Sequence, residues 1–442
     1  MKINLPKDVK FIIKTLQDAG YEAYAVGGCV RDTILGREPD DWDITTSAKP
    51  QEIKELFYPT IDTGIKHGTV TVLRNHVGYE VTTYRIDGEY EDSRHPKEVI
   101  FTANLKDDLL RRDFTINAMA YNDIDGLVDE YGGLEDIKAA IIRCVGNAEE
   151  RFSEDALRMM RAVRFSAQLG YTIEDETKEA IKKLCPNLAN ISAERICVEL
   201  TKLLVSDHPD YLRQAYELGI TKVVFPELND CMECNQNNIH HCYTVGEHIL
   251  HSLHGVENEK ILRFAMLFHD IGKPLCKTTD EKGIDHFHGH NESSAIIAHD
   301  VMKRLRFDND TLYKVEKLVK YHDLKIDKDK RIVRRTINRI GEDLFPYLLL
   351  VKEADVLAQS DYKRDDKLNE LANLWNKYDE ILHNNECVSL KNLKINGKEL
   401  IALGMQPGPK IGMVLNSLLD IVLDDPEKNT RDELLAIAKE MV

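Results

Sequence analysis

The sequence predicts an α+β protein in which a mixed N-terminal part is followed by a long series of helices. Short segments of alternating polarity, bounded by turn residues, mark about the first 125 residues, whereas the later sequence carries apolar residues at helical spacing. Histidine use changes along the chain as well, because eleven of the 16 histidines fall between His240 and His322. At 442 residues the chain has room for about three domains.

Composition excludes a membrane protein and a disulfide scaffold. The chain is 43% hydrophobic and 31% charged, and it contains no apolar run near the ~18–20 residues of a membrane span. Nine cysteines at irregular spacing predict reduced thiols and a cytoplasmic location. The net charge of −17 argues against a uniformly basic nucleic-acid binder. It leaves room for a local basic groove, and the Arg-rich stretches 111–112 and 158–164 are candidates.

The N-terminal elements can be predicted in order. An amphipathic pattern predicts a helix over about 7–19, and Glu22–Val26 predicts a strand that leads into a Gly turn and a short helix. Thr69–Arg74 and Tyr79–Arg85 predict a hairpin with a turn near Asn75–Gly78.

The rest of the chain is helical in pattern. Long helical runs such as SEDALRMMRAVRFSAQLG and SAERICVELTKLLV cover about 134–223, and residues 226–360 are helical and His-rich. The remainder is helical except for the loop LGMQPGPKIG, where Pro and Gly residues exclude a helix interior. We therefore predict four parts, over residues 1–133, 134–225, 226–360 and 361–442.

A phosphate site is predicted at the motif GGCVRD, residues 27–32. Two glycines between a strand and a helix let the backbone approach a phosphate closely, and the helix N-terminus favours an anion. We expect Gly28 and Arg31 to bind the nucleotide, with Arg31 supplying a fork suited to phosphate. An ordinary strand–helix connection is the alternative when this motif is considered alone.

Asp41 and Asp43 are the predicted catalytic residues. On a strand, residues i and i+2 point to the same face, so both carboxylates can hold the same pair of Mg²⁺ ions. A solvated acidic turn is the alternative, and the nearby GGCVRD favours the metal site. Glu80 is a candidate for a third carboxylate. Arg111 and Arg112 are expected to hold a triphosphate. The alternative is a pair of surface residues that cap a strand. We predict Arg112 as the nucleotide-binding residue of the two.

These motifs resemble those of a known family. GGCVRD, DWD and RRDFTINA are similar in order and spacing to the motifs of the class II tRNA nucleotidyltransferase and poly(A) polymerase family. The similarity continues through YEDSRHP, EDALRMMRAVRF and SAERICVELTKLL. It is strong over the first half of the chain and looser over the last 50 residues. The resemblance implies a polymerase-β-like nucleotidyltransferase head, a helical neck that recognises the base, and a helical tail that binds tRNA.

A protein template for base selection is predicted in the neck. Asp155, Arg158, Arg161 and Arg164 recur every three residues, and a solvated salt-bridged face is the ordinary interpretation of such a row. A carboxylate can accept a hydrogen bond from the exocyclic amine of C or A while an Arg donates one to the ring nitrogen. U and G present a carbonyl and a ring N–H instead, which oppose the carboxylate and the Arg respectively. In the resembling family the matching positions select the base, and the two following Arg contact the nucleotide.

The resulting functional prediction is addition of C, C and A to the 3′ end of tRNA from CTP and ATP, with Mg²⁺. YEDSRHP resembles the family's flexible loop, tied to the switch from CTP to ATP, and the segment 63–72 lacks the basic-Phe run of family poly(A) polymerases. Poly(A) polymerase and partial addition are the alternatives on the same scaffold. Alternatives of another class are a phosphohydrolase with an RNA-binding N-terminal half and a noncatalytic tRNA-binding protein.

The His-rich part predicts a second metal site. HDIGKP places His269 and Asp270 together, and mixed N/O ligands suit a divalent transition metal better than Mg²⁺. The order resembles the HD phosphohydrolase superfamily, which implies that His248, His269, Asp270 and Asp355 hold one metal and that His290 and His322 match the ligands of a second. We expect His251, His254 and His299 to be ordinary core or surface groups. Cys231 and Cys234 form a C-x-x-C without a second pair, so free thiols are favoured over zinc.

Overall fold

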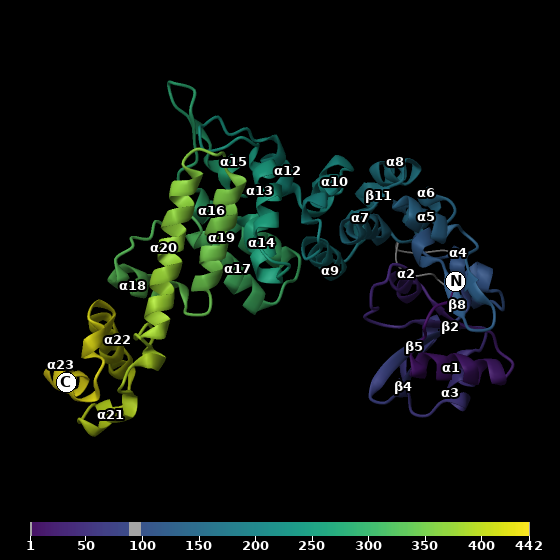
Figure 1. Ribbon diagram of the computed structural model, residues 1–442, viewed down its shortest axis with the longest axis horizontal. Coiled ribbons are helices and arrows are strands. Elements are labelled where there is room, and N and C mark those ends of the chain that lie inside the picture. The colour runs from purple at the N-terminus through teal and green to yellow at the C-terminus, as the bar shows by residue number, and fades with distance from the viewer. Residues whose placement is uncertain (1, 88–98, 442) are drawn as a thin grey trace. The chain divides into compact units, whose positions relative to one another are not determined.

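A computed structural model describes residues 2–87 and 99–441 of the chain and divides it into two units, residues 1–226 and 227–442 (Figure 1). The first unit holds the predicted head and neck, and the second holds the predicted HD part and tail. The finer boundaries at 133/134 and 360/361 remain predictions. The predicted loop YEDSRHP, residues 90–96, lies outside the described residues.

The head is built on a seven-stranded mixed sheet. All of its neighbouring strands are antiparallel except β2 and β5, which run parallel. Every residue of β1 is buried, which fits a strand covered on both faces. In spatial order the strands are β3 (Thr60–Gly64), β4 (Thr69–Arg74), β5 (Val77–Thr83), β2 (Ile44–Thr46), β1 (Ala23–Val26), β8 (Ala120–Asn122) and β9 (Gly126–Val128).

The helices of the first unit follow the predicted pattern. The helix expected over about 7–19 is α1, and it buries Val9, Ile12, Ile13 and Leu16 at helical spacing. The head helices are α1 (Lys7–Asp18), α2 (Gly28–Ile34), α3 (Pro50–Leu56) and α4 (Leu105–Leu110), and α5 (Gly133–Ala139) follows at the predicted boundary between head and neck. The neck helices are α6 (Ala148–Glu154), α7 (Leu157–Leu169), α8 (Asp175–Leu184), α9 (Ala193–Leu204), α10 (Leu212–Glu217) and α11 (Thr221–Val224).

The predicted hairpin forms, with a shorter turn than expected. Asn75 and His76 both have positive φ, at 50° and 65°, and connect β4 directly to β5. Two residues with positive φ form the turn that matches the twist of antiparallel strands. Strand β5 therefore starts at Val77 and ends at Thr83, so the predicted Tyr79–Arg85 was shifted by two residues. Short sheets join β6 (Arg85–Asp87) to β7 (Val99–Phe101) and β10 (Ile141–Ile142) to β11 (Thr172–Ile173).

The second unit consists of helices and one small hairpin. Its helices are α12 (Pro226–Glu233), α13 (Val245–Ser252), α14 (Lys260–Phe268), α15 (Lys273–Cys276), α16 (His290–Arg304), α17 (Asn309–Tyr321), α18 (Lys330–Ile340), α19 (Phe345–Ala358), α20 (Arg364–His383), α21 (Gly397–Ala402), α22 (Pro409–Asp424) and α23 (Arg431–Met441). The hairpin joins β12 (Thr278–Thr279) to β13 (Asp285–His286). The predicted Pro- and Gly-rich loop, residues 403–412, separates α21 from α22 only up to Gly408. Its last four residues form the first turn of α22, where Pro409 is tolerated because the first helical position needs no backbone N–H donor. Leu400, Leu418, Val422 and Leu434 form a core of their own at the C-terminal end.

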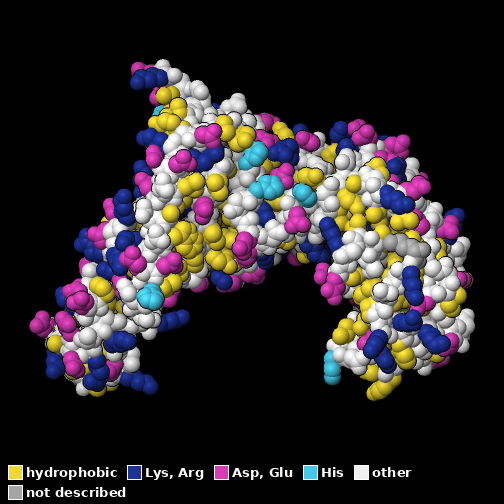
Figure 2. Space-filling view, in the orientation of Figure 1, with side chains coloured by type: hydrophobic (Ala, Val, Ile, Leu, Met, Phe, Trp, Pro, Cys, Tyr) yellow, Lys and Arg dark blue, Asp and Glu magenta, His cyan; other side chains and the backbone are white. Residues whose placement is uncertain are grey.

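Surface charge is mixed in both units. Lys and Arg side chains are interspersed with Asp and Glu on the visible face of each (Figure 2). The net charge of −17 is therefore compatible with local groups of arginines. Within the described residues, no helix has the length and apolar character to cross a membrane.

Candidate active sites

The first site begins where β1 ends. Gly27 precedes α2 with φ +85°, a conformation that side chains with a Cβ rarely adopt. A Cβ at Gly27 would lie 2.9 Å from Nη1 of Arg112. The glycine therefore lets an arginine guanidinium lie directly against the backbone at the start of α2.

Asp41 and Asp43 lie in the segment that leads into β2. The sequence placed both on a strand, but β2 begins at Ile44. The main-chain oxygen of Asp43 still accepts a hydrogen bond from the Val26 amide at 3.0 Å, so pairing with β1 extends to this residue. Desolvation by surrounding protein and the charge of Asp41 raise the pKa of Asp43 to about 6, while Arg112 opposes the rise.

Glu80 lies on the strand next to these carboxylates. Strands β2 and β5 are parallel, and Ile44 lies opposite Val81. Asp43 and Glu80 each come one residue before this pair. The charge of Glu80 contributes to the raised pKa of Asp43. Asp41, Asp43 and Glu80 nevertheless do not form a cluster of three ligand atoms within 4.8 Å in the part of the chain that the structure describes. The role of Glu80 as a third ligand remains a prediction.

The two adjacent arginines of RRDFTINA have different environments. Arg111 donates to Oδ1 of Asp108 through Nε at 2.9 Å and Nη2 at 2.7 Å. Nη2 of Arg112 lies 3.6 Å from Oδ2 of the same carboxylate, and its buried Nε has no hydrogen-bond partner among the described residues. The same guanidinium approaches Gly27 through Nη1, and its orphaned buried Nε is a donor that a bound phosphate oxygen would satisfy.

Arg31 is buried and held by the protein itself. Its guanidinium donates to both carboxylate oxygens of Asp32, at 2.9 and 2.8 Å, and to Oδ1 of Asn117 at 2.7 Å. Asn117 in turn donates to Asp113 at 3.2 Å. The sequence predicted a phosphate fork at Arg31, whereas Asp32, Asn117 and Asp113 were not singled out. Asn117 and Asp113 belong to the RRDFTINA motif, which was the available signal.

Asp155 does not lie on the helical row that its spacing suggested. Its backbone is extended, between the end of α6 and the start of α7, and its Oδ1 accepts from the Leu157 amide at 3.1 Å. An Asp that caps a helix N-terminus in this way sits outside the helix. Arg195 of α9 donates to both oxygens of Asp155, at 3.2 and 2.7 Å.

The three arginines of α7 are also engaged. Arg158 donates to Oε2 of Glu154 at 2.6 Å and to the main-chain oxygen of Arg111 at 2.8 Å. Arg161 donates to Asp113 at 2.7 Å, and this ion pair keeps the pKa of Asp113 low although burial alone would raise it. Arg164 donates to Glu199 of α9 at 2.5 Å. Glu199, like Arg195, was not singled out from the sequence.

A cavity of about 670 Å³ brings most of these residues together. Residues from the head and from α7 line it, so the metal and arginine motifs converge within one unit. Asp155 and Arg158 are absent from its lining and are paired with other side chains. The predicted site residues that line it are Gly28, Arg31, Asp41, Asp43, Arg112, Arg161 and Arg164.

The second site is formed by four histidines with the same orientation. In each ring Nδ1 lies within hydrogen-bond distance of a main-chain oxygen: 3.2 Å for His248, 2.7 Å for His269, 2.8 Å for His290 and 2.7 Å for His322. A carbonyl can only accept, so in every ring Nδ1 is the protonated donor. The Nε2 atoms are thus left free to bind metal. Donation of the other ring N–H to a main-chain carbonyl is common in metal-binding histidines.

Asp270 lies between two pairs of these rings. Its Oδ2 is 3.3 Å from Nε2 of both His248 and His269, and its Oδ1 is 3.3 Å from Nε2 of His290 and 3.7 Å from that of His322. Asp355 adds Oδ1 at 3.0 Å from His248. All six predicted residues are therefore brought together in two groups that share the Asp270 carboxylate.

The donor set fits a pair of divalent cations. Nε2 of His248 lies 3.1 Å from Nε2 of His269, and the corresponding separation for His290 and His322 is 3.2 Å. Two lone pairs at this distance repel unless a proton or a metal ion lies between them. Burial lowers the pKa of His269, but the charges of Asp270 and Asp355 outweigh it and raise the value to about 10. The site therefore attracts positive charge strongly.

The remaining candidates are ordinary groups. His299 pairs with Glu316 at 2.9 Å, and His251 stacks on Tyr243. Cys231 is buried, with its thiol directed at the main-chain oxygen of Ile271, and Cys234 is a separate free thiol. No cysteine takes part in a metal-ligand cluster within the described residues.

Three family models match the chain. The poly A polymerase head domain matches residues 23–143, an RNA- and SrmB-binding site of polymerase A matches residues 170–232, and domain 2 of tRNA nucleotidyltransferases matches residues 288–438. A CCA-adding enzyme from Lactiplantibacillus plantarum is 56% identical over 200 residues, which span 45% of this chain and 49% of that protein. That alignment thus spans about half the length of the relative.

Full-length relatives and solved structures extend the match. A CCA-adding enzyme from Levilactobacillus brevis is 35% identical and covers 98% of both chains. The crystal structure of the Bacillus stearothermophilus CCA-adding enzyme in complex with CTP has a TM-score of 0.73, with 28% identity over 98% of this chain and 96% of that chain. A Thermotoga maritima CCA-adding enzyme complexed with tRNA shares the fold, at TM-score 0.61 and 20% identity over 99% of each chain. With one curated relative matching nearly end to end at 35% identity, the chain belongs to the CCA-adding enzyme family.

Proposed function

We propose that the first unit adds C, C and A to the 3′ end of tRNA from CTP and ATP, with Asp41 and Asp43 as the ligands of the catalytic Mg²⁺ ions. The single observation that supports this best is the cavity where both carboxylates meet Gly27, Arg112, Arg161 and Arg164. Two Mg²⁺ ions held there would neutralise the triphosphate and activate the 3′-hydroxyl.

The protein's own groups account for binding of the triphosphate. The guanidinium of Arg112 lies against the backbone of Gly27 through Nη1, and its unpartnered Nε would donate to a phosphate oxygen. Arg31 is already held by Asp32 and Asn117. We propose that it contacts phosphate as an oriented, partly neutralised cation. Glu80 is the candidate third carboxylate.

Base selection is assigned to Asp155 and Arg158, as the family resemblance implies. Asp155 is paired with Arg195, and Arg158 with Glu154. Each carboxylate oxygen has two lone pairs, so an exocyclic amine can be accepted by Asp155 without loss of Arg195. An incoming C or A would also require Arg158 to turn from main-chain oxygens toward the ring nitrogen.

Incubation with tRNA that lacks its last three nucleotides tests the function. The expected result is incorporation of C, then C, then A, with each nucleotide supplied alone or in turn. Repeated A addition would instead identify a poly(A) polymerase, and addition that stops before A would identify a partial enzyme. The predicted partners are thus tRNA, CTP and ATP, with the helical tail contacting tRNA. The nine free cysteines favour a cytoplasmic location.

A second function, metal-dependent phosphohydrolysis, is proposed for the second unit. Four Nε2 atoms facing one another around Asp270 are the observation that favours it. His248, His269, Asp270 and Asp355 would hold one ion, and Asp270, His290 and His322 the other. Such ions would supply Lewis acidity toward a phosphate ester. Binding of Mn²⁺ to the whole chain, followed by hydrolysis of p-nitrophenyl phosphate, is the test, and absence of any bindable metal would reject the proposal.

A further inference from the structure

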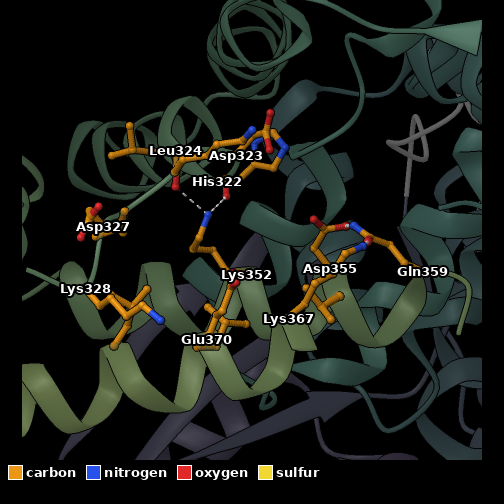
Figure 3. Close-up of a pocket in the computed structure, with 15 residues that line it drawn as sticks. His322, Asp323, Leu324, Asp327, Lys328, Lys352, Asp355, Gln359, Lys367 and Glu370 are labelled. Carbon is orange, nitrogen blue, oxygen red and sulfur yellow. Dashed lines mark hydrogen bonds between the residues drawn. The ribbon is translucent and has the colours of Figure 1, made fainter. Parts of the chain in front are cut away.

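A second cavity adjoins the metal-ligand cluster of the second unit. It has a volume of about 550 Å³ and lies between the loop 322–328 on one side and helices α19 and α20 on the other (Figure 3). A larger cavity of about 1040 Å³ contains Asp270 and His290. Both cavities are lined by His322, Asp323, Lys325, Asp355, Gln359 and Lys367. They are therefore two lobes of one cavity, which we call the metal lobe and the α20 lobe.

The α20 lobe has an apolar floor and charged groups around it. Val356 of α19 and Leu371 and Leu374 of α20 line the floor and are largely buried. Lys328 and Glu370 also line this lobe but not the metal lobe. A pocket with apolar walls and a few polar groups is the usual environment of a small organic ligand.

The junction between the lobes carries a positive charge. Nζ of Lys367 donates to Oε1 of Gln359 at 2.5 Å, and Nε2 of Gln359 donates to Oδ1 of Asp355 at 3.0 Å. The side-chain amide of Gln359 thus links the ammonium group of Lys367 to the carboxylate of Asp355, a predicted metal ligand. A phosphate held in the metal lobe would lie next to Lys367, with its ester substituent directed into the α20 lobe.

The wall of this lobe is fixed in place by a partly buried lysine. Lys352 of α19 donates to the main-chain oxygens of His322 at 2.6 Å and Leu324 at 3.0 Å (Figure 3). The same helix carries Asp355 one turn later. The loop that bears His322 is therefore tied to the helix that bears another ligand, and the lobe exists before a ligand binds. Such preorganisation lowers the entropic cost of binding.

We propose that the α20 lobe binds the ring-bearing alcohol portion of a phosphate ester, and that Lys367 binds the phosphate at the junction. This inference rests on the proposed phosphohydrolase function and names its class of substrate. It also makes α20, which the sequence assigned to the tRNA-binding tail, a part of the second site.

Phosphonates that resist hydrolysis test the ring site by binding alone. The Mn²⁺-loaded full-length chain is titrated with phenylphosphonate and with methylphosphonate by calorimetry. The wild type is expected to bind the phenyl compound about tenfold more tightly, since burial of one ring contributes about 1.4 kcal/mol or more. Leu374→Trp fills the lobe and should remove this preference while binding of methylphosphonate stays the same. Leu382→Trp, at an exposed position on the same helix, is the matched control and should keep the preference.

Lys367→Met tests the phosphate contact. The substitution should weaken the binding of both phosphonates to a similar degree, about tenfold, because a charge-assisted contact is lost. Mn²⁺ stoichiometry should not change, since Lys367 touches no ligand directly. Lys367→Arg should restore most of the affinity, and Lys363→Met, at an exposed neighbouring lysine, should have no effect.

The outcomes separate this inference from the function on which it rests. If the wild-type chain binds no Mn²⁺, the phosphohydrolase proposal and the inference both fail. If Mn²⁺ and methylphosphonate bind but phenylphosphonate shows no preference, or if Leu374→Trp retains the preference, the inference alone is wrong. Loss of Mn²⁺ in Lys367→Met would overturn the assignment of Lys367 to the phosphate.

Discussion

The two sites of this chain differ in how far the protein alone completes them. In the second unit each of the four candidate ligand histidines is oriented by a main-chain carbonyl, and Asp270 joins both ligand groups. In the first unit Asp41 and Asp43 are exposed and repel each other, while Arg161 and Arg164 are held by carboxylates of the protein. The donor atoms of the second site are thus oriented by the protein itself, whereas the carboxylates of the first site repel each other, a repulsion that the proposed Mg²⁺ ions would relieve.

The largest effect is expected at the carboxylates of the first site. Asp43→Ala or Asp41→Ala should lower nucleotide incorporation by on the order of a thousandfold, because two-metal stabilisation of attacking and leaving oxygens is lost. Both residues are exposed, so the melting temperature should change little. Single-turnover incorporation into tRNA lacking its CCA end is the measurement. Rates within tenfold of wild type in both variants would remove the two carboxylates from the mechanism.

The next effect tests whether the second site works independently. Asp270→Ala removes the carboxylate shared by both ligand groups and should abolish Mn²⁺-dependent hydrolysis of p-nitrophenyl phosphate, with bound Mn²⁺ measured in parallel. Incorporation of C and A should remain within about twofold of wild type, since non-coupled sites behave additively. A parallel loss of both activities, in a protein that is still folded, would show that the sites are coupled.

A smaller effect is expected from the close approach at Gly27. Gly27→Ala places a Cβ 2.9 Å from Nη1 of Arg112 and also strains the backbone at φ +85°. Displacement of Arg112 should raise the KM of all four triphosphates alike, by about tenfold, because one charged contact to phosphate is weakened. Gly36→Ala, also at positive φ but with open space around the Cβ, controls for backbone strain. Equal losses in the two variants would mean that Arg112 is not involved.

An effect of similar size, confined to base choice, is expected at Asp155. Asp155→Ala should reduce discrimination of C against U and of A against G by about tenfold in kcat/KM, which corresponds to one lost contact of about 1.4 kcal/mol. Arg112→Ala is the comparison, because a phosphate contact carries no base identity and should slow all nucleotides equally. A uniform loss in both variants would indicate that Asp155 only caps α7 and holds Arg195, as its observed contacts allow.

Local sequence patterns were sufficient for much of the fold. Apolar spacing predicted α1 to within one residue. Pro and Gly predicted a loop before α22, although the helix begins at Pro409 and includes the last four residues of the predicted loop. The length of the hairpin turn was predicted less well. Asn75 and His76, both with positive φ, form a two-residue connection where the sequence predicted four residues. The row of charges from Asp155 to Arg164 misled for a related reason. A three-residue spacing cannot reveal that Asp155 caps a helix instead of lying within it.

Residue types and their spacing were enough to predict the kind of chemistry: paired carboxylates beside a glycine turn, arginines that suit phosphate, and histidines concentrated in one segment. Which of these groups meet depends on the packing of separate elements, because their contacts join residues far apart in the chain. Asp113 meets Arg161, Asp155 meets Arg195, and Asp270 meets His322. The same holds for α20, whose leucines close a lobe beside Asp355. Spacing along one helix or strand is fixed by local backbone geometry, whereas these contacts depend on how separate elements pack.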